Sequence, residues 1–276
     1  MGAEAGKLVI FGAGNIGRSF IGQLFSRAGY EIVFIDIDPI ILNELNHKGC
    51  YRVVVKQNDT ADREILVEGV RGVDGTDRDA VIEEIFDASV IATAVGKSAI
   101  PHILPAIAAG IGGRLAAGKG GVDVIIAENI RDAAEWFRRE LFPALGHHRR
   151  PDEVVGLVET SIGKMVPIMT AEDRQDDPLQ VFAEAYNTLI VDRRGFRNPV
   201  PQLPGLHVVE NIKAYVDRKL FVHNLGHAAA AYLGYKTHPE RRYIYEHMLD
   251  GSVAQAVRKC MSEAATALHR EYPEDL

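Results

Sequence analysis

Residues 7–17 are Lys7-Leu-Val-Ile-Phe-Gly12-Ala-Gly14-Asn-Ile-Gly17, and they are the strongest indication of the fold of the N-terminal half. Its first five residues form an apolar run typical of a buried strand, and three glycines follow directly. A helical pattern begins inside the glycine set and continues over residues 16–27. The stretch therefore predicts a strand, a tight glycine turn and a helix in immediate succession.

Each glycine has a physical role in such a turn. Gly12 makes the turn, Gly14 lets a pyrophosphate approach the backbone, and Gly17 lets the helix pack closely on the strand. The N-terminus of the helix offers unpaired N–H groups to the phosphates. Asp36 ends the next strand, over 31–36, where a carboxylate hydrogen-bonds ribose hydroxyls and repels a 2′-phosphate.

This combination predicts a dinucleotide site that prefers NAD to NADP. FAD, or a glycine turn that holds no nucleotide, remain open alternatives. Residues 93–96 end a later strand at the same sheet edge and are a candidate contact near the nicotinamide, or an ordinary strand-to-helix turn. The candidate cofactor-binding residues are Gly12, Ala13, Gly14, Asn15, Ile16, Gly17, Asp36, Thr93 and Val95.

Short β-rich runs alternate with helical patterns through the first half of the chain. The expected strands are Lys7–Phe11, Glu31–Asp36, Tyr51–Lys56, Glu64–Glu68, Ala88–Ala94, Val122–Ala127 and Val154–Glu159. The expected helices between them are Ile16–Arg27, Ile40–His47, Arg78–Ile85, Ala99–Ala109 and Arg131–Leu141. Such alternation predicts an α/β fold with a Rossmann-type, doubly wound sheet.

The pattern changes after Pro167. Residues 170–178 are polar, 193–206 are rich in proline and glycine, and two long helical patterns follow at Val209–Leu233 and Ile244–His269. We therefore expect a nucleotide-binding domain over 1–165 and a mostly helical domain over 166–276.

Composition excludes several classes of protein. The formal net charge is −7 with no long basic run, which argues against nucleic acid or an anionic membrane as the main partner. No apolar run is long enough to span a bilayer. Two distant cysteines imply no disulfide framework and fit a cytoplasmic protein with reduced thiols. The sequence leaves the oligomeric state open.

A second group of polar residues lies in the long helical pattern, at Lys219, Asn224 and His227. At 100° per residue, Asn224 falls at about 140° and His227 at about 80° from Lys219, so all three share one broad arc. An ammonium, an amide and an imidazole on one face could surround a substrate oxygen, with the lysine as general base. The residues alone also fit a solvated helix face. His223 and His227 could suggest zinc, but no third ligand is evident, so we expect no metal.

These motifs resemble those of a known family. They are Gly12 to Arg18 with Phe20-Ile-Gly22, Ala127-Glu-Asn129, Asp176-Asp-Pro-Leu179 and Lys219-x4-Asn224-x2-His227-Ala. In order and spacing, from about residue 7 to the C-terminus, they resemble the polyol-specific long-chain dehydrogenases of the mannitol dehydrogenase family, which work without zinc.

The resemblance implies NAD-dependent interconversion of D-mannitol 1-phosphate and D-fructose 6-phosphate, a phosphorylated polyol and ketose. It implies that Lys219 is the general acid/base, that Asn224 and Asn129 stabilise an oxyanion, and that His227 orients substrate or lysine. A related polyol or sugar-acid dehydrogenase (mannitol 2-dehydrogenase, fructuronate or tagaturonate reductase) and a truncated, non-catalytic NAD-binding homologue are the alternatives.

Two departures from the family pattern stand out. Members are usually longer, with further helices, so we expect the helical domain to be incomplete relative to the family. Lys164 stands where the family usually carries arginine, which keeps a cation and loses the bidentate fork.

Overall fold

The computed structural model describes residues 6–57, 60–145, 150–167, 169–170 and 172–276. The chain divides into two compact units, Met1–Glu210 and Asn211–Leu276. The division therefore lies at residue 210 and not near the expected position of 165. The reason is that residues 166–210 supply further strands to the first unit, where the sequence predicted a mostly helical domain.

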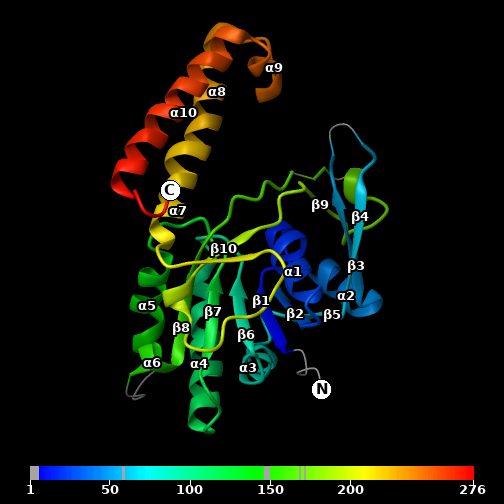
Figure 1. Ribbon diagram of the computed structural model, residues 1–276. Helices are drawn as coiled ribbons and strands as arrows, with labels where there is room; N and C mark the ends of the chain where they lie inside the picture. The colour runs from blue at the N-terminus through cyan, green and yellow to red at the C-terminus, as the bar shows by residue number, and fades with distance from the viewer. Residues whose placement is uncertain (1–5, 58–59, 146–149, 168, 171) are drawn as a thin grey trace. The chain divides into compact units, whose positions relative to one another are not determined.

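The first unit is built on an eight-stranded sheet of order β11-β10-β8-β7-β6-β1-β2-β5. Figure 1 shows this sheet from β8 to β5, with β1 near its middle. All pairings between β8 and β5 are parallel, and β10 joins β8 antiparallel. The strands are β1 (Lys7–Phe11), β2 (Glu31–Asp36), β5 (Val70–Asp74), β6 (Val90–Thr93), β7 (Val122–Ile126), β8 (Val155–Ser161), β10 (Leu189–Asp192) and β11 (Leu206–Val209).

Both faces of the sheet are buried, which explains the nearly continuous apolar runs of its strands. Leu8 and Ile10 of β1 belong to one core cluster, and Val9 and Phe11 belong to another. The first cluster includes residues of η1 (Gly17–Gly22) and α1 (Gln23–Ser26). The second includes residues of α3 (Arg78–Phe86), α4 (Ile100–Ala116) and α5 (Ala133–Ala144). The doubly wound sheet predicted from the sequence is confirmed.

Two predicted strands lie outside this sheet. β3 (Cys50–Val55) and β4 (Arg63–Glu68) form an antiparallel hairpin, and β9 (Val181–Ala183) completes a three-stranded sheet with them. Strand β5 follows this hairpin immediately and was not predicted. Gly69 alone separates β4 from β5, and its φ of +71° turns the backbone between the two strands. The remaining elements of the unit are α2 (Pro39–Lys48), α6 (Pro151–Val154), η2 (Glu172–Arg174) and η3 (Arg193–Gly195).

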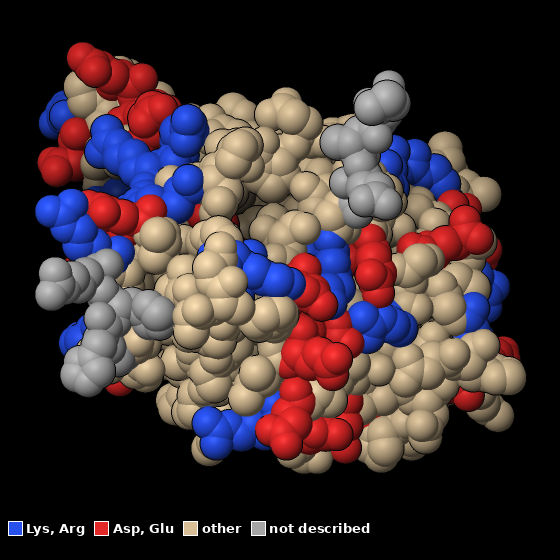
Figure 2. All heavy atoms as spheres, turned by 90° about the horizontal axis from the view of Figure 1, so that it is seen from below, with Lys and Arg blue, Asp and Glu red and all other residues tan. Residues whose placement is uncertain are grey.

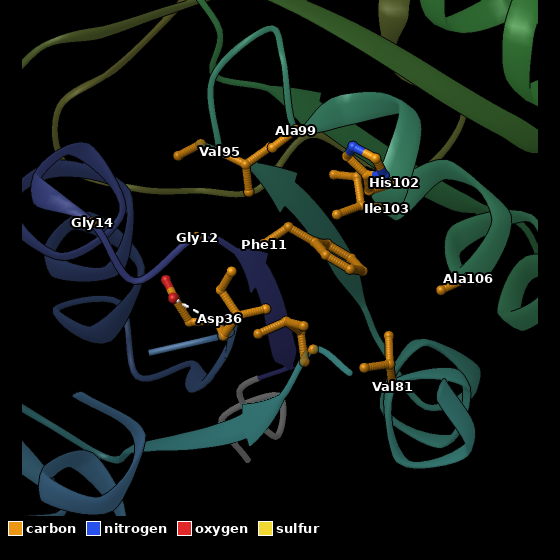
Figure 3. A pocket seen from close by; sticks show the side chains of 14 residues that line it. Phe11, Gly12, Gly14, Asp36, Val81, Val95, Ala99, His102, Ile103 and Ala106 are labelled. Atoms are coloured by element: carbon orange, nitrogen blue, oxygen red, sulfur yellow. Dashed lines mark hydrogen bonds between the residues drawn. The ribbon is translucent and has the colours of Figure 1, made fainter. Parts of the chain in front are cut away.

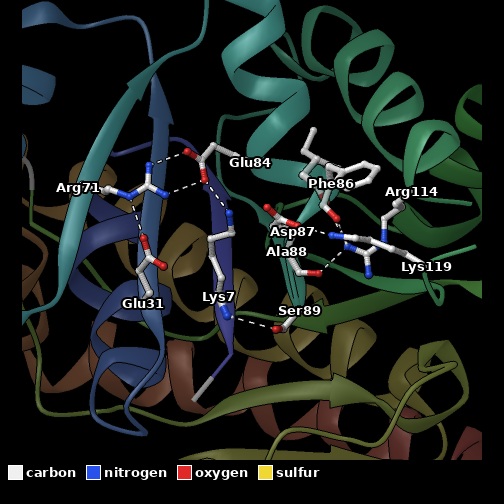
Figure 4. A network of polar contacts seen from close by, with 11 residues as sticks. Lys7, Glu31, Arg71, Glu84, Phe86, Asp87, Ala88, Ser89, Arg114 and Lys119 are labelled. Atoms are coloured by element: carbon white, nitrogen blue, oxygen red, sulfur yellow. Dashed lines mark hydrogen bonds and ion pairs between the residues drawn. The ribbon is translucent and has the colours of Figure 1, made fainter. Parts of the chain in front are cut away.

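Ion pairs and a buried arginine hold the amino ends of the central strands (Figure 4). Glu84 accepts from Lys7 at 2.9 Å and from Arg71 at 2.6 and 2.7 Å. Arg114 donates to three carbonyl oxygens of the segment that ends α3 and leads into β6, among them that of Ala88 at 2.7 Å. On the face shown in Figure 2, Lys and Arg are interspersed with Asp and Glu, so neither sign of charge dominates that view.

The second unit is helical. Its elements are α7 (Ile212–Arg218), the π-helix η4 (Lys219–Asn224), α8 (Leu225–Thr237), α9 (Ile244–Met248) and α10 (Gly251–Glu271). A small core of Ala230, Val253 and Val257 lies where α8 packs on α10. The predicted helix Val209–Leu233 thus begins at Ile212 and contains a π-helical turn. The predicted helix Ile244–His269 is two helices, because Asp250 caps α10 by accepting from Ser252 N at 2.8 Å.

Candidate active site

The glycine turn has the geometry that its sequence predicted. Gly12 adopts φ +100°, and a Cβ there would lie 2.5 Å from the carbonyl oxygen of Ala94. A Cβ on Gly17 would lie 2.0 Å from the carbonyl oxygen of Gly12, so only glycine lets the helix begin this close to the turn. A Cβ on Gly14 would meet no heavy atom within 4 Å, which leaves the backbone of Gly14 open to a ligand.

Asp36 holds this turn against the end of β2. Its Oδ2 accepts the N–H of Ala13 at 2.6 Å, and its Oδ1 accepts the N–H groups of Ile37 at 2.7 Å and Asp38 at 3.1 Å. The carboxylate is therefore fixed by the backbone on both oxygens, while the residue stays partly exposed. Each carboxylate oxygen can accept more than one hydrogen bond, so Asp36 can also accept from ligand hydroxyls.

A cleft of about 410 Å³ opens beside the turn and Asp36 (Figure 3). Its lining is mainly apolar, with Asp36 and His102 as the ionisable members. The lining residues are Phe11, Gly12, Gly14, Ile35, Asp36, Ile37, Gly75, Val81, Ala94, Val95, Ala99, His102, Ile103 and Ala106. An apolar cleft flanked by one carboxylate and an open glycine backbone suits a planar base attached to a ribose and phosphates.

Among the other predicted cofactor residues, only Val95 belongs to the lining of this cleft. Ala13 is buried, and Asn15 and Ile16 are half-buried at the start of the helical segment. Val95 lines the cleft. Thr93 is fully buried and does not line it; its carbonyl accepts the N–H of Ala127 at 2.9 Å and so belongs to the β6–β7 contact.

The structure adds a residue that sequence reasoning missed. Glu128 follows β7 and is 6% exposed. Its Oε1 accepts the N–H of Val95 and its Oε2 the N–H of Gly96, both at 2.9 Å. Burial raises the pKa of Glu128, and these backbone hydrogen bonds oppose that rise. The available signal was a glutamate next to Asn129 at the end of a buried strand, where a charged side chain needs a reason to be buried.

Asn129 lies beside Glu128 in the connection from β7 to α5 and is exposed. This connection leaves the carboxyl end of β7, the sheet edge at which ligands bind in open α/β folds. Glu159, near the end of β8, is buried near the start of α5, where backbone N–H groups of Asp132, Ala133 and Ala134 oppose the rise in its pKa that burial causes. The connection that carries Asn129 therefore has a buried carboxylate near each end.

In the helical unit, Lys219 and Asn224 are the two ends of the π-helix η4. The hydrogen bonds of a π-helix run from residue i to i+5, so residues five apart follow each other on one side of the helix. This geometry brings Lys219 and Asn224 closer in direction than the regular α-helical spacing predicted. Burial lowers the pKa of the Lys219 ammonium from its ordinary value of 10.5.

His227 follows in the first turn of α8 and is exposed. Its ring lies 4.7 Å from that of His223, centroid to centroid. Within the described ranges, no group of three or more His, Cys, Asp or Glu side chains is placed to hold a metal ion.

The two units correspond to two domains of one known family. The family described as "Mannitol dehydrogenase Rossmann domain" matches residues 6–205, and "Mannitol dehydrogenase C-terminal domain" matches residues 211–275. The chain belongs to the mannitol dehydrogenase family. The family boundary coincides with the division between the two compact units.

Individual relatives agree with this assignment. The chain is 38% identical over 269 residues to the mannitol-1-phosphate 5-dehydrogenase of Brevibacillus brevis, covering 97% of this chain and 68% of that protein. It is 35% identical to the enzyme of the same name from Geobacillus stearothermophilus, covering 96% and 68%. The chain therefore spans about two thirds of the length of these relatives.

Solved structures share the fold at low sequence identity. A substrate-free D-sorbitol dehydrogenase matches with a TM-score of 0.77 at 14% identity, over 95% of this chain and 69% of that one. Mannitol 2-dehydrogenase of Pseudomonas fluorescens, in a ternary complex with NAD and D-mannitol, matches with a TM-score of 0.74 at 15% identity, over 93% and 63%.

Across the described parts of the chain, no helix combines the length and apolar character needed to cross a membrane.

Two of the sequence motifs quoted above, the glycine motif with Arg18 and the Asp176–Leu179 segment, contact each other. Arg18, directly after the glycine turn, is buried and donates to the carbonyl oxygens of Pro178 at 3.3 Å and Leu179 at 2.8 Å. Asp177, in the same loop, pairs with Lys48 at 3.2 Å and with Arg52 at 3.5 Å. Arg18 therefore holds the Asp-Asp-Pro-Leu motif against the helix that follows the glycine turn, and Asp177 holds it against α2 and β3.

The ammonium of Lys164 is buried and hydrogen-bonded within the protein. It is 7% exposed, and its ammonium donates to the carbonyl oxygens of Glu184 at 3.3 Å and Tyr186 at 2.8 Å and to Oδ1 of Asn187 at 2.9 Å. These three acceptors match the three N–H donors of an ammonium group. The planar guanidinium of an arginine would direct its N–H donors differently. Burial lowers the pKa of Lys164 to about 8.

Proposed function

We propose that this chain catalyses the NAD-dependent interconversion of D-mannitol 1-phosphate and D-fructose 6-phosphate. The observation that carries the proposal is the 38% identity to a mannitol-1-phosphate 5-dehydrogenase, sustained over 97% of the chain and across both family domains. The sequence carries the Lys219-x4-Asn224-x2-His227 pattern, and a protein that only bound a nucleotide would have no chemical use for these three side chains.

The residues around the cleft fit NAD. Gly14 leaves its backbone open where the pyrophosphate would lie, and Val95 lines the same cleft. Asp36 would accept from the adenosine ribose hydroxyls, and its negative charge disfavours a 2′-phosphate at that position. We therefore propose NAD rather than NADP as the cofactor. When bound, NADH supplies the hydride that reduces the carbonyl carbon of the sugar.

The proton is assigned to Lys219. In ketose reduction its ammonium donates a proton to the carbonyl oxygen, and in polyol oxidation the neutral amine takes the proton from the hydroxyl. A lowered pKa favours this role because it increases the neutral fraction near neutral pH.

The oxygen also needs hydrogen-bond donors while it carries negative charge. We assign this role to the side-chain amides of Asn224 and Asn129, and assign His227 to orienting the substrate or Lys219. The π-helical turn supports the pairing of Lys219 with Asn224, because both leave η4 on one side.

The phosphate requires cationic partners. Lys213 and Arg218 are candidates because they precede Lys219 on α7, and both are exposed. The guanidinium of Arg218 lies over the ring of Tyr215, 4.7 Å from its centroid, which limits the directions that it can take. Arg218→Ala should raise the KM for fructose 6-phosphate and leave weak turnover of fructose unchanged.

We place the enzyme in the cytoplasm, where phosphorylated sugars occur.

A substrate panel tests the proposal. NADH oxidation is followed with fructose 6-phosphate, fructose, fructuronate and tagaturonate at equal concentrations, with NADPH as a parallel cofactor. We expect turnover with fructose 6-phosphate and NADH at a kcat/KM at least 100-fold above every other pair. Preference for an unphosphorylated ketose or a sugar acid would reassign the substrate, and NADH binding without turnover of any of them would make the chain a binding protein.

A further inference from the structure

One strand of the main sheet carries two buried carboxylates with the same hydrogen-bonding pattern. Asp123 lies near the amino end of β7 and is 2% exposed, and Glu128 lies just beyond its carboxyl end and is 6% exposed. Each carboxylate accepts two consecutive backbone N–H groups, one on each oxygen. Those of Asp123 come from Arg197 at 2.8 Å and Asn198 at 3.2 Å.

Glu128, at the carboxyl end of β7, differs from Asp123 in the backbone segment that it holds. The N–H groups that Glu128 accepts belong to Val95 and Gly96, in the turn after β6. Both N–H groups point at the same carboxylate, and the turn also requires φ +83° at Gly96, a conformation that glycine adopts without strain. Two such N–H groups form a small anion-binding concavity, and here the protein fills it with its own carboxylate.

This turn is part of the cofactor cleft. Val95 lines the cleft, and its side chain would lie 3.2 Å from a Cβ on Gly12, so the turn backs onto the glycine motif. On the other side, Glu128 is the covalent neighbour of Asn129. The side chain of Glu128 therefore fixes the turn that lines the cleft relative to the backbone that presents the amide of Asn129.

We propose that Glu128 is a positioning residue, which sets the placement of the Val95–Gly96 turn relative to Asn129 and thereby aligns the cofactor with the reacting oxygen. This inference rests on the proposed function for its kinetic consequence, but its structural consequence does not. Misplacement of reacting groups by about 1 Å costs up to roughly 100-fold in rate, so a small shift of this turn is sufficient.

Glu128→Gln tests the inference, with Asp123→Asn as its matched control. Each amide keeps the shape of its carboxylate, but its NH2 group cannot accept, so one of the two backbone N–H groups loses its partner. Backbone amide exchange should increase at Val95 and Gly96 in the first variant and at Arg197 and Asn198 in the second. We expect both variants to lose thermal stability to a similar degree, since burial and bonding are alike.

Only Glu128→Gln should impair function. We expect its kcat with fructose 6-phosphate to fall at least 10-fold, with a smaller change in KM, and its Kd for NADH to rise about 3- to 10-fold. Asp123→Asn should stay within about 2-fold of the wild type in all three. If Glu128→Gln does not fold, Glu128→Asp replaces it, because the shorter carboxylate keeps the charge and draws the turn inward.

The outcomes separate the two proposals. Wild-type kcat and NADH affinity in the Glu128 variant, or equal losses in both variants, would overturn the positioning role. If the wild type does not turn over fructose 6-phosphate, the proposed function fails, and the Kd for NADH and the exchange at Val95 and Gly96 still decide the role of Glu128.

Discussion

Substitution of Asp36 tests the nucleotide site directly, because its carboxylate accepts backbone hydrogen bonds within the protein and is also expected to accept hydrogen bonds from the ligand. Inside, it accepts three backbone N–H groups at 2.6, 2.7 and 3.1 Å. Toward the ligand, it is expected to accept from ribose hydroxyls. Asp36→Ala removes both functions, and Asp36→Asn removes the charge while it keeps one acceptor oxygen.

The size of the effect follows from these bonds. A hydrogen bond to a charged group contributes about 1.5–3 kcal/mol, so losing the ribose contact should weaken NADH binding about 10- to 150-fold. The N–H of Ala13 is buried, and leaving it without an acceptor should cost about 1–3 kcal/mol of stability in Asp36→Ala. For NADPH the lost repulsion offsets the lost hydrogen bond, so its affinity should change less and the preference for NADH should shrink.

The assay is titration of NADH and NADPH by fluorescence, with thermal unfolding measured in parallel. Asp38→Ala is the control, since Asp38 is two residues away and caps α2 by accepting from Ile40 N at 2.9 Å. It should lose about 1 kcal/mol of stability with no change in NADH affinity. NADH affinity that is unchanged in Asp36→Ala, or equally weakened in Asp38→Ala, would refute the assigned role.

Three further predictions address other parts of the structure. Gly17→Ala should weaken NADH binding at least 10-fold and destabilise the fold, because its Cβ would lie 2.0 Å from the carbonyl oxygen of Gly12; equilibrium titration of the variant checks this. For Lys219, whose pKa burial lowers below 10.5, kcat for polyol oxidation should rise with pH through that pKa and kcat for ketose reduction should fall, and Lys219→Met should lose both dependences together with at least 100-fold in rate. The pKa of Lys164 is about 8 in the folded protein and 10.5 in the unfolded chain, so the unfolded chain binds more protons between these pH values. The free energy of unfolding should therefore rise by roughly 2–3 kcal/mol from pH 8 to 10.5. Denaturant titrations of Lys164→Met should show no such rise.

The glycine turn and the central strands were predictable because their local chemistry and the fold require the same residues. A Cβ on Gly17 is excluded by the carbonyl oxygen of Gly12 inside the motif itself, so short-range sequence contains this constraint, whereas the close contact at Gly12 is with Ala94, far along the chain. The central strands β1, β2, β6, β7 and β8 were predicted correctly because both of their faces are buried, while β5, β10 and β11 of the same sheet were not predicted. Asp36 was identified by its distance from the turn, and the structure places its carboxylate on Ala13.

Long-range contacts were not predictable from local patterns. The domain boundary was expected near 165, but β10 pairs with β8 and β9 pairs with β3, and no local signal specifies such partners. The partners of Glu128 were hidden for the same reason, because they lie more than thirty residues earlier in the chain. A side chain that hydrogen-bonds distant backbone is visible only once the strands are arranged.

The helical region shows a different limit. Patterning at 100° per residue correctly predicted a helix through Lys219 and Asn224 but treated it as a regular α-helix. The π-helical turn changes the relative directions of these side chains without changing the residues. Departures of this kind are frequent at functional sites and depend on packing that a period cannot encode.

In the proposed reaction, hydride passes from bound NADH to the carbonyl carbon of fructose 6-phosphate. The direct measurement uses NADH carrying deuterium at the transferred position and examines the sugar product by mass spectrometry. We expect a hexitol phosphate that contains one deuterium at the former carbonyl carbon in the wild type, and at least 100-fold slower formation in Lys219→Met at unchanged NADH affinity. A wild-type protein that binds the labelled cofactor and forms no deuterated product would contradict this reaction.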